Sequence, residues 1–319
     1  MSVRVLAPGL LTTLQDGGRQ GWRHLGVGGA GALDAYSHAV ANLLVGNAED
    51  APVLEATLAG PRLAFEHATR IALCGADIDA SADGIAVPGW RPVELPAGTT
   101  LALGACRAGA RAVLAVAGGF TVPAVLGSAS TDLRGGFGGL GGRPLVAGDT
   151  LPMAAANGTA AAFAVAPWWI DPAPDLDFKA PVRVRVLPGR DALVPGDALF
   201  REAWRVAAAS DRQGLRLEGA PLSPHARREA VSEPVVPGTI QLPPDGSPIV
   251  LLADAQTHGG YPRIGHAIRA DRPRLAQLRP GDTLHFVPCT ASEARRLACE
   301  QRQRLARIAH AIEHRRALR

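Results

Sequence analysis

The chain has 319 residues and a mass of 33.0 kDa, a length that suits two domains of about 150 residues each. Hydrophobic residues make up 47% of it and charged residues 19%, which excludes disorder as the main state. The net charge is +4 and the sequence pI is about 9.2, values that raise the possibility of a nucleic-acid partner. However, residues 291–319 hold eight arginines against three glutamates, and the rest of the chain carries 25 basic and 26 acidic groups. We therefore expect no nucleic-acid partner.

Cysteine and histidine spacing gives no sign of a structural cross-link. Four cysteines occur, at positions 74, 106, 289 and 299, without a C-x-x-C pair or a histidine cluster, so we expect no disulfide framework and no metal. The N-terminus lacks signal-peptide features. The uncharged stretch 153–170 contains Asn157, Gly158 and Pro167, which argue against a membrane helix. These observations predict a soluble cytoplasmic protein without a membrane partner.

The predicted elements are mainly strands. Short apolar or alternating runs bounded by glycine and proline predict strands along the whole chain. They are Val3–Leu6, Arg70–Leu73, Ala112–Val116, Val182–Leu187, Ile249–Leu252 and Thr283–Val287. Pro243-Pro244-Asp245-Gly246 predicts a turn between two such runs.

Three helices are predicted. Residues 33–45 place apolar side chains at helical spacing and end at Gly46, a typical C-cap. A short helix is expected over 197–203, after Pro195. The tail begins at Thr290 with Glu293 three residues later, which fits a capping box, and Leu297, Leu305, Ile308 and Ile312 mark its apolar face.

An internal repeat organises the chain. Val3-Arg-Val-Leu recurs as Val184-Arg-Val-Leu, and Arg19-Gln-Gly recurs as Arg212-Gln-Gly. Glu55 and Glu233 each precede a glycine by five residues and an isoleucine by sixteen, and the apolar runs that follow end at Asp77 and Asp254. The shared order predicts two homologous domains built as small β-barrels. We assign 1–152 to the first domain, 153–181 to a final strand and Pro-rich linker, 182–290 to the second domain and 291–319 to a basic C-terminal helix.

Four longer motifs resemble a known family. They are the segments Pro8–Arg19, Ala41–Asn47, Ser210–Gly219 and Gln256–Pro262. The chain is similar, up to about residue 290, to the biotin-dependent carboxyltransferase-like, or allophanate-hydrolase-subunit-2-like, family. Two departures stand out: the family's usual Thr-Gly-Gly-Tyr-Pro-Lys is here His258-Gly-Gly-Tyr-Pro-Arg263, and Val27–Asp34 differs from the usual Val-Pro-x-Ser-Gly-Ala-Met-Asp.

The resemblance implies a fold and an activity. The fold would be two tandem cyclophilin-like β-barrels with a few short helices and a C-terminal helix. For a separate chain of this size, the family implies a 5-oxoprolinase component of the C type, active only in a complex. That complex would open 5-oxoproline (pyroglutamate) to L-glutamate with ATP as cosubstrate, Mg²⁺ accompanying the nucleotide. The implied partners are a B-type cyclophilin-fold protein and an A-type protein, the other two kinds of subunit in such a complex.

Two other functions stay open. One is a carboxyltransferase component of a urea carboxylase or allophanate-type system, and the other is a non-enzymatic regulatory partner of a kinase-inhibitor protein. The first would need biotin on another chain, because the single lysine, Lys179, has no methionines beside it and no biotin is expected on this chain.

Opening a lactam after phosphorylation of its oxygen requires cations for the anion and amides to orient the ring. Residues that occur in only one half of the repeat are the better candidates for this chemistry. As catalytic residues we predict Arg263, Tyr261, His258 and Gln256. As substrate-binding or anion-binding residues we predict Arg19, Gly28, Asp34, Arg212, Gln241, Asp254, Gly259 and Gly260.

Structural roles stand beside these predictions. Glu55, Asp77 and Glu233 are assigned to structure, since Arg19–Glu55 and Arg212–Glu233 ion pairs would tie each barrel together. His258 is equally expected as a solvated loop histidine, and Asp34 as a first-turn carboxylate favoured by the helix dipole. The glycines at 136, 138 and 141, between Arg134 and Arg143, predict either a loop over an anion or a disordered loop.

Overall fold

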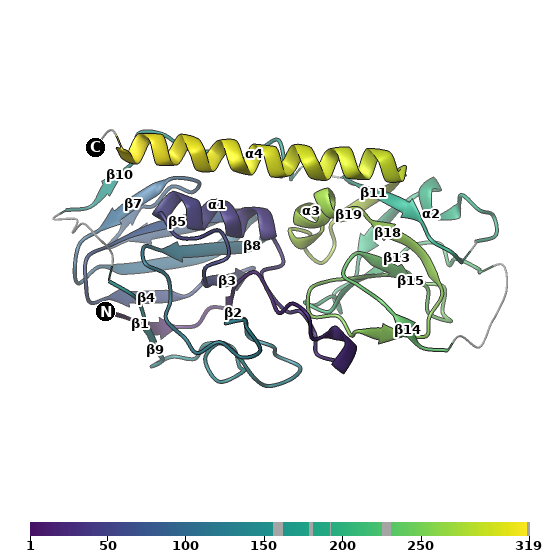
Figure 1. The fold of residues 1–319 in the computed structure, drawn as a ribbon, viewed down its shortest axis with the longest axis horizontal. Coiled ribbons are helices and arrows are strands. Elements are labelled where there is room, and N and C mark those ends of the chain that lie inside the picture. The colour runs from purple at the N-terminus through teal and green to yellow at the C-terminus, as the bar shows by residue number, and fades with distance from the viewer. Residues whose placement is uncertain (156–161, 179–180, 192, 225–230, 318–319) are drawn as a thin grey trace. The chain divides into compact units, whose positions relative to one another are not determined.

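A computed structural model describes residues 1–155, 162–178, 181–191, 193–224 and 231–317; Lys179 lies outside them. Most elements are strands, and the predicted mainly β architecture with a C-terminal helix is confirmed (Figure 1). The chain divides into two compact units. Unit 1 comprises Met1–Arg19, Ala30–Pro174 and Gln303–Arg319; unit 2 comprises Gln20–Gly29 and Asp175–Arg302. Segment 20–29 thus belongs to unit 2, and the C-terminal helix contributes residues to both units. The division expected from the sequence instead put 20–29 in the first domain and treated the helix as a separate segment.

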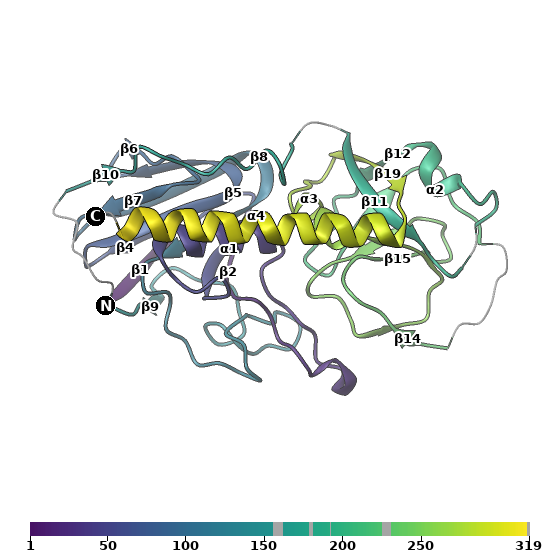
Figure 2. The ribbon, with the colours of Figure 1, turned by 45° about the horizontal axis from the view of Figure 1, so that its top comes forward.

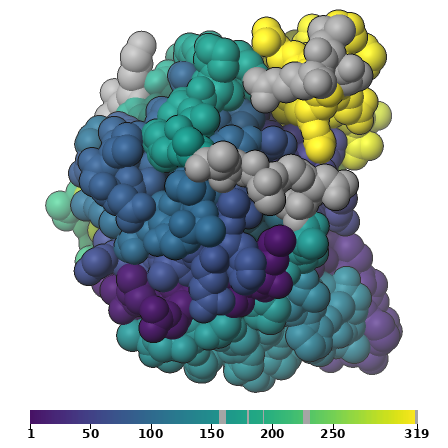
Figure 3. Space-filling view, turned by 90° about the vertical axis from the view of Figure 1, so that its left-hand side faces the viewer, coloured from purple at the N-terminus to yellow at the C-terminus, as the bar shows by residue number. Residues whose placement is uncertain are grey.

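Unit 1 is built on one ten-stranded sheet with the order β10-β7-β5-β8-β4-β1-β9; β2 pairs with β3, β3 with β8, and β6 with β5. In Figure 3 the N-terminal residues, drawn purple, lie among the blue and teal residues of the same unit, as the pairing of β1 with β4 and β9 requires. The strands are β1 (Ser2–Ala7), β2 (Leu11–Gln15), β3 (Val53–Thr57), β4 (Arg62–Phe65), β5 (Thr69–Ala82), β6 (Ile85–Ala86), β7 (Pro92–Leu95), β8 (Thr100–Val116), β9 (Thr150–Pro152) and β10 (Ala164–Val165).

Strand β5 shows how the sequence fills both faces of this sheet. Successive side chains of a strand point to opposite faces. Ile71 and Leu73 are buried in one hydrophobic cluster, whereas Ala72 and Cys74 are buried in a second cluster. Helix α1 (Ala35–Val45) covers the second face, and its Val40 belongs to that cluster. A continuous apolar run therefore indicates a strand buried on both sides.

Helix α1 has the ends that the sequence predicts. Asp34 is its N-cap, and the Asp34 carboxylate accepts hydrogen bonds from the Ser37 amide at 2.9 Å and the Ser37 hydroxyl at 2.6 Å. Gly46 ends the helix with φ 87°, in the left-handed region where glycine carries no Cβ penalty.

Unit 2 contains a closed seven-stranded barrel with the order β11-β18-β15-β16-β13-β12-β19. Its strands β11, β12, β15 and β19 are labelled in Figure 2. A parallel pairing of β11 with β19 helps to close it, and the other neighbours run antiparallel. Strands β14 (Glu233–Pro234) and β17 (His258–Gly259) form a separate two-stranded ribbon. The barrel strands are β11 (Val182–Pro188), β12 (Ala203–Val206), β13 (Gly214–Glu218), β15 (Thr239–Gln241), β16 (Ile249–Leu251), β18 (Arg263–Ala267) and β19 (Thr283–Pro288).

Short helices complete unit 2: η1 (Arg23–Leu25), α2 (Ala198–Arg201), η2 (Arg269–Asp271) and α3 (Arg272–Ala276). The predicted helix over 197–203 is therefore shorter than expected. The helix ends at Arg201, and strand β12 begins at Ala203. Trp204 of this strand is 2% exposed, and its indole N–H donates a hydrogen bond to the Leu199 carbonyl at 3.0 Å. Burial of this large side chain in the barrel determines the local structure more strongly than helical propensity does.

The C-terminal helix α4 (Ala291–Ala317) begins as predicted, with the Glu293 amide donating to the Thr290 hydroxyl at 3.2 Å. In unit 2 its Leu297 packs on the cluster that contains Ile268 and Cys289. In unit 1 its residues Leu305, Ile308 and Ile312 belong to the cluster that α1 covers, so the predicted apolar face is confirmed. Over the described ranges, no helix combines the length and apolar character needed to cross a membrane.

Candidate functional site

A cavity of about 670 Å³ lies on unit 2. Three neighbouring barrel strands, β13, β16 and β15, contribute to its lining, together with residues 243–247 and the loop that carries Gln256 and Tyr261. On β13 the lining residues Arg216 and Glu218 are exposed, whereas Leu215 and Leu217 are buried. Polar side chains thus project from the outer face of the barrel into this cavity.

Gln241 is the most enclosed polar residue of the lining, with 1% of its surface exposed. Its Oε1 accepts a hydrogen bond from Gln256 Nε2 at 3.3 Å. Its own Nε2 is buried and has no hydrogen-bond partner among the described residues. The two glutamines were both predicted as site residues, and the structure brings them together at one cavity.

The loop from 256 to 263 distributes its predicted residues unequally around the cavity. Tyr261 is 46% exposed and belongs to the lining. His258 is exposed, with its Nδ1 2.9 Å from the Thr257 hydroxyl, and it does not line the cavity. Gly259 lies against Gln241, because a Cβ at this position would stand 2.6 Å from Gln241 Nε2. Its neighbour Gly260 is partly exposed.

Arg263 is occupied by an ion pair. Its Nη2 binds the Glu233 carboxylate, and its Nη1 donates to the Pro234 carbonyl at 3.3 Å. Arg190 approaches the same Glu233 carboxylate at 3.0 Å, and Asp191 Oδ2 accepts the Arg263 amide at 2.7 Å. Arg263 is not among the lining residues of the cavity, so the geometry assigns it to the support of the loop and the β14–β17 ribbon.

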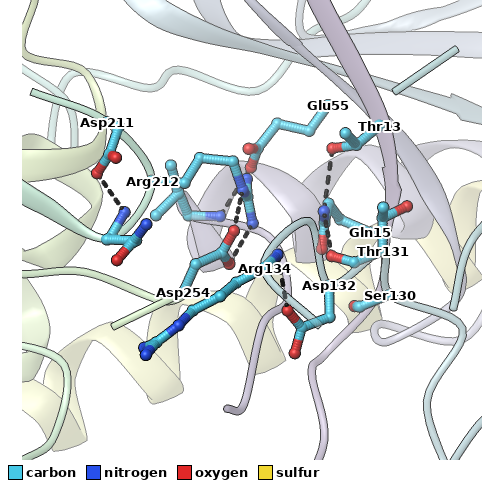
Figure 4. A network of polar contacts seen from close by, with 12 residues as sticks. Thr13, Gln15, Glu55, Ser130, Thr131, Asp132, Arg134, Asp211, Arg212 and Asp254 are labelled. Carbon is cyan, nitrogen blue, oxygen red and sulfur yellow. Dashed lines mark hydrogen bonds and ion pairs between the residues drawn. The ribbon is translucent and has the colours of Figure 1, made fainter. Parts of the chain in front are cut away.

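A buried ion pair joins Arg212 to Asp254 (Figure 4). Arg212 Nε lies 2.8 Å from Asp254 Oδ2 and its Nη2 lies 3.0 Å from Oδ1, with both side chains at most 5% exposed. The Arg212–Glu233 pair expected from the repeat is therefore wrong. Arg212 precedes β13 and Asp254 follows β16, which are paired strands, whereas Glu233 lies in the separate ribbon.

In unit 1 the repeat places Arg19, Glu55 and Asp77 at the positions that correspond to Arg212, Glu233 and Asp254, and their surroundings differ. Arg19 is 2% exposed; its Nε donates to the Val125 carbonyl at 3.1 Å, and its guanidinium carbon lies 4.6 Å from the Phe137 ring centroid. Glu55 accepts the Leu33 amide at 2.7 Å. Asp77 is exposed on β5, in contrast to the buried Asp254. The repeat therefore predicts the strands better than it predicts the side-chain environments.

The glycine-rich loop after β8 is held in hydrogen-bonded turns. Asp132 accepts the amides of Arg134 at 3.1 Å and Gly135 at 2.8 Å, and Figure 4 shows Asp132 with Arg134. Arg143 binds Asp149 through two bonds of 2.8 Å, which lower the pKa of that carboxyl. Arg143, one of the two arginines expected to bind an anion beside this loop, is therefore already paired with Asp149.

The predicted site near Gly28 lies in the segment that belongs to unit 2. There Arg23 donates through Nη2 to the Val235 carbonyl at 2.5 Å and to the Gln256 carbonyl at 3.3 Å. Burial lowers the pKa of Arg23. The segment is therefore anchored to the start of the loop that carries Gln256, a connection that no local pattern in the sequence predicts.

Sequence reasoning also missed several polar residues of the lining. They are Asp211, Gln213, Arg216, Glu218, Asp245 and Ser247. The available signals were the motif 210–219 and the turn 243–246, which the sequence analysis used for family and turn assignment alone. Over the described residues, no group of three or more His, Cys, Asp or Glu side chains could hold a metal ion.

Comparisons with known proteins add a second line of argument. The profile of the carboxyltransferase domain, subdomain A and B, matches residues 25–288. The C subunit of 5-oxoprolinase from Escherichia coli is 41% identical over 314 residues, which cover 96% of this chain and 97% of that protein. Urea amidolyase of Saccharomyces cerevisiae is 33% identical over 93% of this chain and 17% of its own length. The crystal structure of Kluyveromyces lactis urea carboxylase superposes with a TM-score of 0.89 at 30% identity, covering 96% of this chain and 29% of that one.

Proposed function

Because the chain belongs to the family of carboxyltransferase domains, subdomain A and B, we propose that it is one component of a 5-oxoprolinase complex. One observation carries this proposal: the 41% identity to the E. coli protein extends over 96% of this chain and 97% of that protein. The complex would convert 5-oxoproline to L-glutamate with ATP as cosubstrate. Its other members would be a B-type cyclophilin-fold protein and an A-type protein.

Within this proposal the cavity of unit 2 receives the substrate. Gln256 and Tyr261 line it and can contact the lactam ring. Arg216 is the one guanidinium that the described lining contributes, and it can bind the substrate carboxylate. Arg263, held by Glu233, would act as a positioning residue for the loop rather than as a group in contact with the reacting atoms.

The nucleotide is a separate question. Asp211 and Asp245 accompany Arg216 in the cavity lining. One guanidinium can pair with the single carboxylate of the substrate, but beside two carboxylates it cannot balance the several negative charges of a triphosphate. The residues present therefore do not fit ATP, and we derive no step through it on this chain. ATP, with Mg²⁺, is proposed to bind another member of the complex.

The proposal is tested by reconstitution. The chain is mixed with its A-type and B-type partners, and formation of glutamate from 5-oxoproline is followed with and without ATP. We expect glutamate only when this chain, both partners and ATP are present. Absence of turnover with folded partners would contradict the proposal.

The second candidate is a carboxyltransferase component that uses biotin on another chain. It is favoured by the 33% identity to yeast urea amidolyase. In the same preparation, transfer of a carboxyl group from a carboxylated biotin carrier to urea, without glutamate formation, would favour this candidate over the first. The cytoplasmic location stays an expectation from the sequence.

A further inference from the structure

The floor of the unit 2 cavity is the outer face of two paired barrel strands. The register of β13 with β16 sets Arg216 opposite Ile249. Two residues away Gly214 lies opposite Leu251, and all four residues line the cavity. Paired residues of antiparallel strands project to the same face, whereas the intervening Val250 is buried on the opposite face. A Cβ on residue 214 would stand 2.9 Å from Ile249 Cγ2, so the glycine leaves this apolar floor uncovered.

The guanidinium of Arg216 stands at one side of this floor. Arg216 is exposed on β13, and its side chain has no hydrogen-bond or ion-pair partner among the described residues. A guanidinium presents a planar fork of donors that matches a carboxylate through two parallel hydrogen bonds. A carboxylate that enters the cavity therefore meets donors that the described part of the fold leaves unused.

The three carboxylates of the lining have partners in their own segments. Asp211 and Asp245 each accept, through Oδ1, the amide of the residue two positions later, at 2.8 and 3.0 Å. Glu218 is paired with Arg205 at 2.6 Å. Both aspartates are exposed, so water screens their charges, whereas a bound carboxylate would contact the Arg216 guanidinium directly. The site can therefore bind one negative charge.

We propose that Arg216 makes this cavity selective for a small monocarboxylic acid over an uncharged amide. The carboxylate binds the guanidinium, and the compact apolar body of the ligand lies on Ile249 and Leu251. In this class 5-oxoproline is the acid that the proposed function supplies, and that identification rests on the proposed function. Urea has neither a carboxylate nor an apolar body, so it lacks both features that this floor recognises.

The test measures binding directly, without turnover. The full chain, alone and with its partner proteins, is titrated with L-5-oxoproline, with its uncharged primary amide and with urea. Ligand-observed NMR gives the dissociation constants for the wild type and for Arg216→Gln. Arg183→Gln, the same change at an exposed position of β11 outside the cavity lining, is the matched control. Thermal unfolding establishes that each variant is folded.

We expect the wild type and Arg183→Gln to bind 5-oxoproline roughly tenfold more tightly than its amide, and urea most weakly. Arg216→Gln should lose this preference, because its binding of the acid weakens roughly tenfold while its binding of the amide hardly changes. Raised ionic strength should weaken binding of the acid to the wild type.

Equal binding of the acid and the amide by the wild type would overturn the inference. So would an unchanged preference in the folded Arg216→Gln variant, or no binding of the acid in either preparation. An Arg216-dependent preference for the acid in a complex that forms no glutamate would instead contradict the proposed function alone. Glutamate formation with an unchanged KM in Arg216→Gln would overturn the inference and leave the proposed function standing.

Discussion

At the scale of single residues, the Arg212–Asp254 pair is the most enclosed ion pair among those described, and two hydrogen bonds join its charged groups where water is excluded. Removing charges from water is costly, and a close bidentate geometry offsets that cost. The pair connects the segment that precedes β13 to the segment that follows β16. Its main consequence is therefore for the stability of unit 2.

Asp254→Asn should lower the free energy of unfolding by about 3–5 kcal/mol, because the buried Arg212 guanidinium would lose the charged partner that binds it through two hydrogen bonds. Urea denaturation measures this change. Asp245→Asn is the matched control: Asp245 is exposed and accepts the Ser247 amide at 3.0 Å, a bond that asparagine retains. A similar small change in both variants would contradict the stabilising role of the pair.

Tyr261 offers a test of the cavity in the reconstituted complex. Tyr261→Phe should lower kcat/KM for 5-oxoproline by roughly three- to tenfold, the effect of losing one hydrogen bond to the substrate. The thermal midpoint should hardly move, because the side chain is 46% exposed. Unchanged kinetics in the folded variant would exclude the Tyr261 hydroxyl from substrate binding.

Three of the residues predicted from the sequence lie together in the structure, and their roles in binding or catalysis stay predictions. Gln241, Gln256 and Tyr261 were chosen from one side of the repeat, and they converge on one cavity. The partner of Arg212 was not predictable, since spacing along the chain does not say which carboxylate a folded barrel places beside it. Arg216 and Glu218 were overlooked because alternation in β13 identifies exposed positions without saying that a cavity covers them.

At the scale of elements, the β14–β17 ribbon is held to β18 by ionic contacts of Glu233. Two arginines share this carboxylate. Arg263 is 25% exposed in its side chain, and Arg190 is 63% exposed. Since both bind the same group from different elements, they form a natural pair of variant and control.

Arg263→Ala should lower turnover at least tenfold if Arg263 positions the loop, whereas Arg190→Ala should leave turnover within about twofold of the wild type. Both changes should cost at most about 1 kcal/mol of stability, because the pairs are partly solvated. Steady-state kinetics and urea denaturation give the two readouts. Equal kinetic effects would show that only the neutralisation of Glu233 matters.

The N-terminus of α1 provides a second test at this scale. Asp34 is fully buried and makes two bonds to Ser37. Asp34→Ala should cost about 1–2 kcal/mol, typical of a lost N-cap, and Asp34→Asn should cost less because it keeps an acceptor. Chemical denaturation checks the order. If Asp34→Asn retains stability but loses turnover, the predicted role in ligand binding would gain support.

At the scale of the whole molecule, two histidines shape the response to acid: the half-buried His266 and the buried His38. Burial, with the nearby positive charge of Arg272, lowers the pKa of His266 to about 4, and burial also lowers the pKa of His38. Between about pH 6.5 and 4 the unfolded chain therefore binds more protons than the folded chain. Stability from these groups is present above pH 6.5 and is lost as the pH falls through this window.

His266→Gln should reduce this loss. We expect the difference in the free energy of unfolding between pH 7.5 and 4.5 to be smaller in the variant than in the wild type. Carboxylates such as Asp16, whose pKa is also lowered, contribute equally to both proteins and cancel in the comparison. Identical pH dependence would contradict the assignment to His266.

Much of the architecture could be predicted at this scale. The predicted strands, α1 and the start of α4 follow from apolar periodicity, caps and turn residues, which are local properties. The parallel pairing of β11 with β19 and the assignment of segment 20–29 to unit 2 depend on contacts distant in sequence. Local patterns do not contain that information, as the shortened α2 also shows.

The central claim is that the cavity of unit 2 receives the lactam substrate. It is tested most directly by an experimental structure of the chain with its partner proteins and bound 5-oxoproline. The account predicts the ring in this cavity, in contact with Gln256 and Tyr261. An ordered 5-oxoproline bound elsewhere, with this cavity empty, would contradict it.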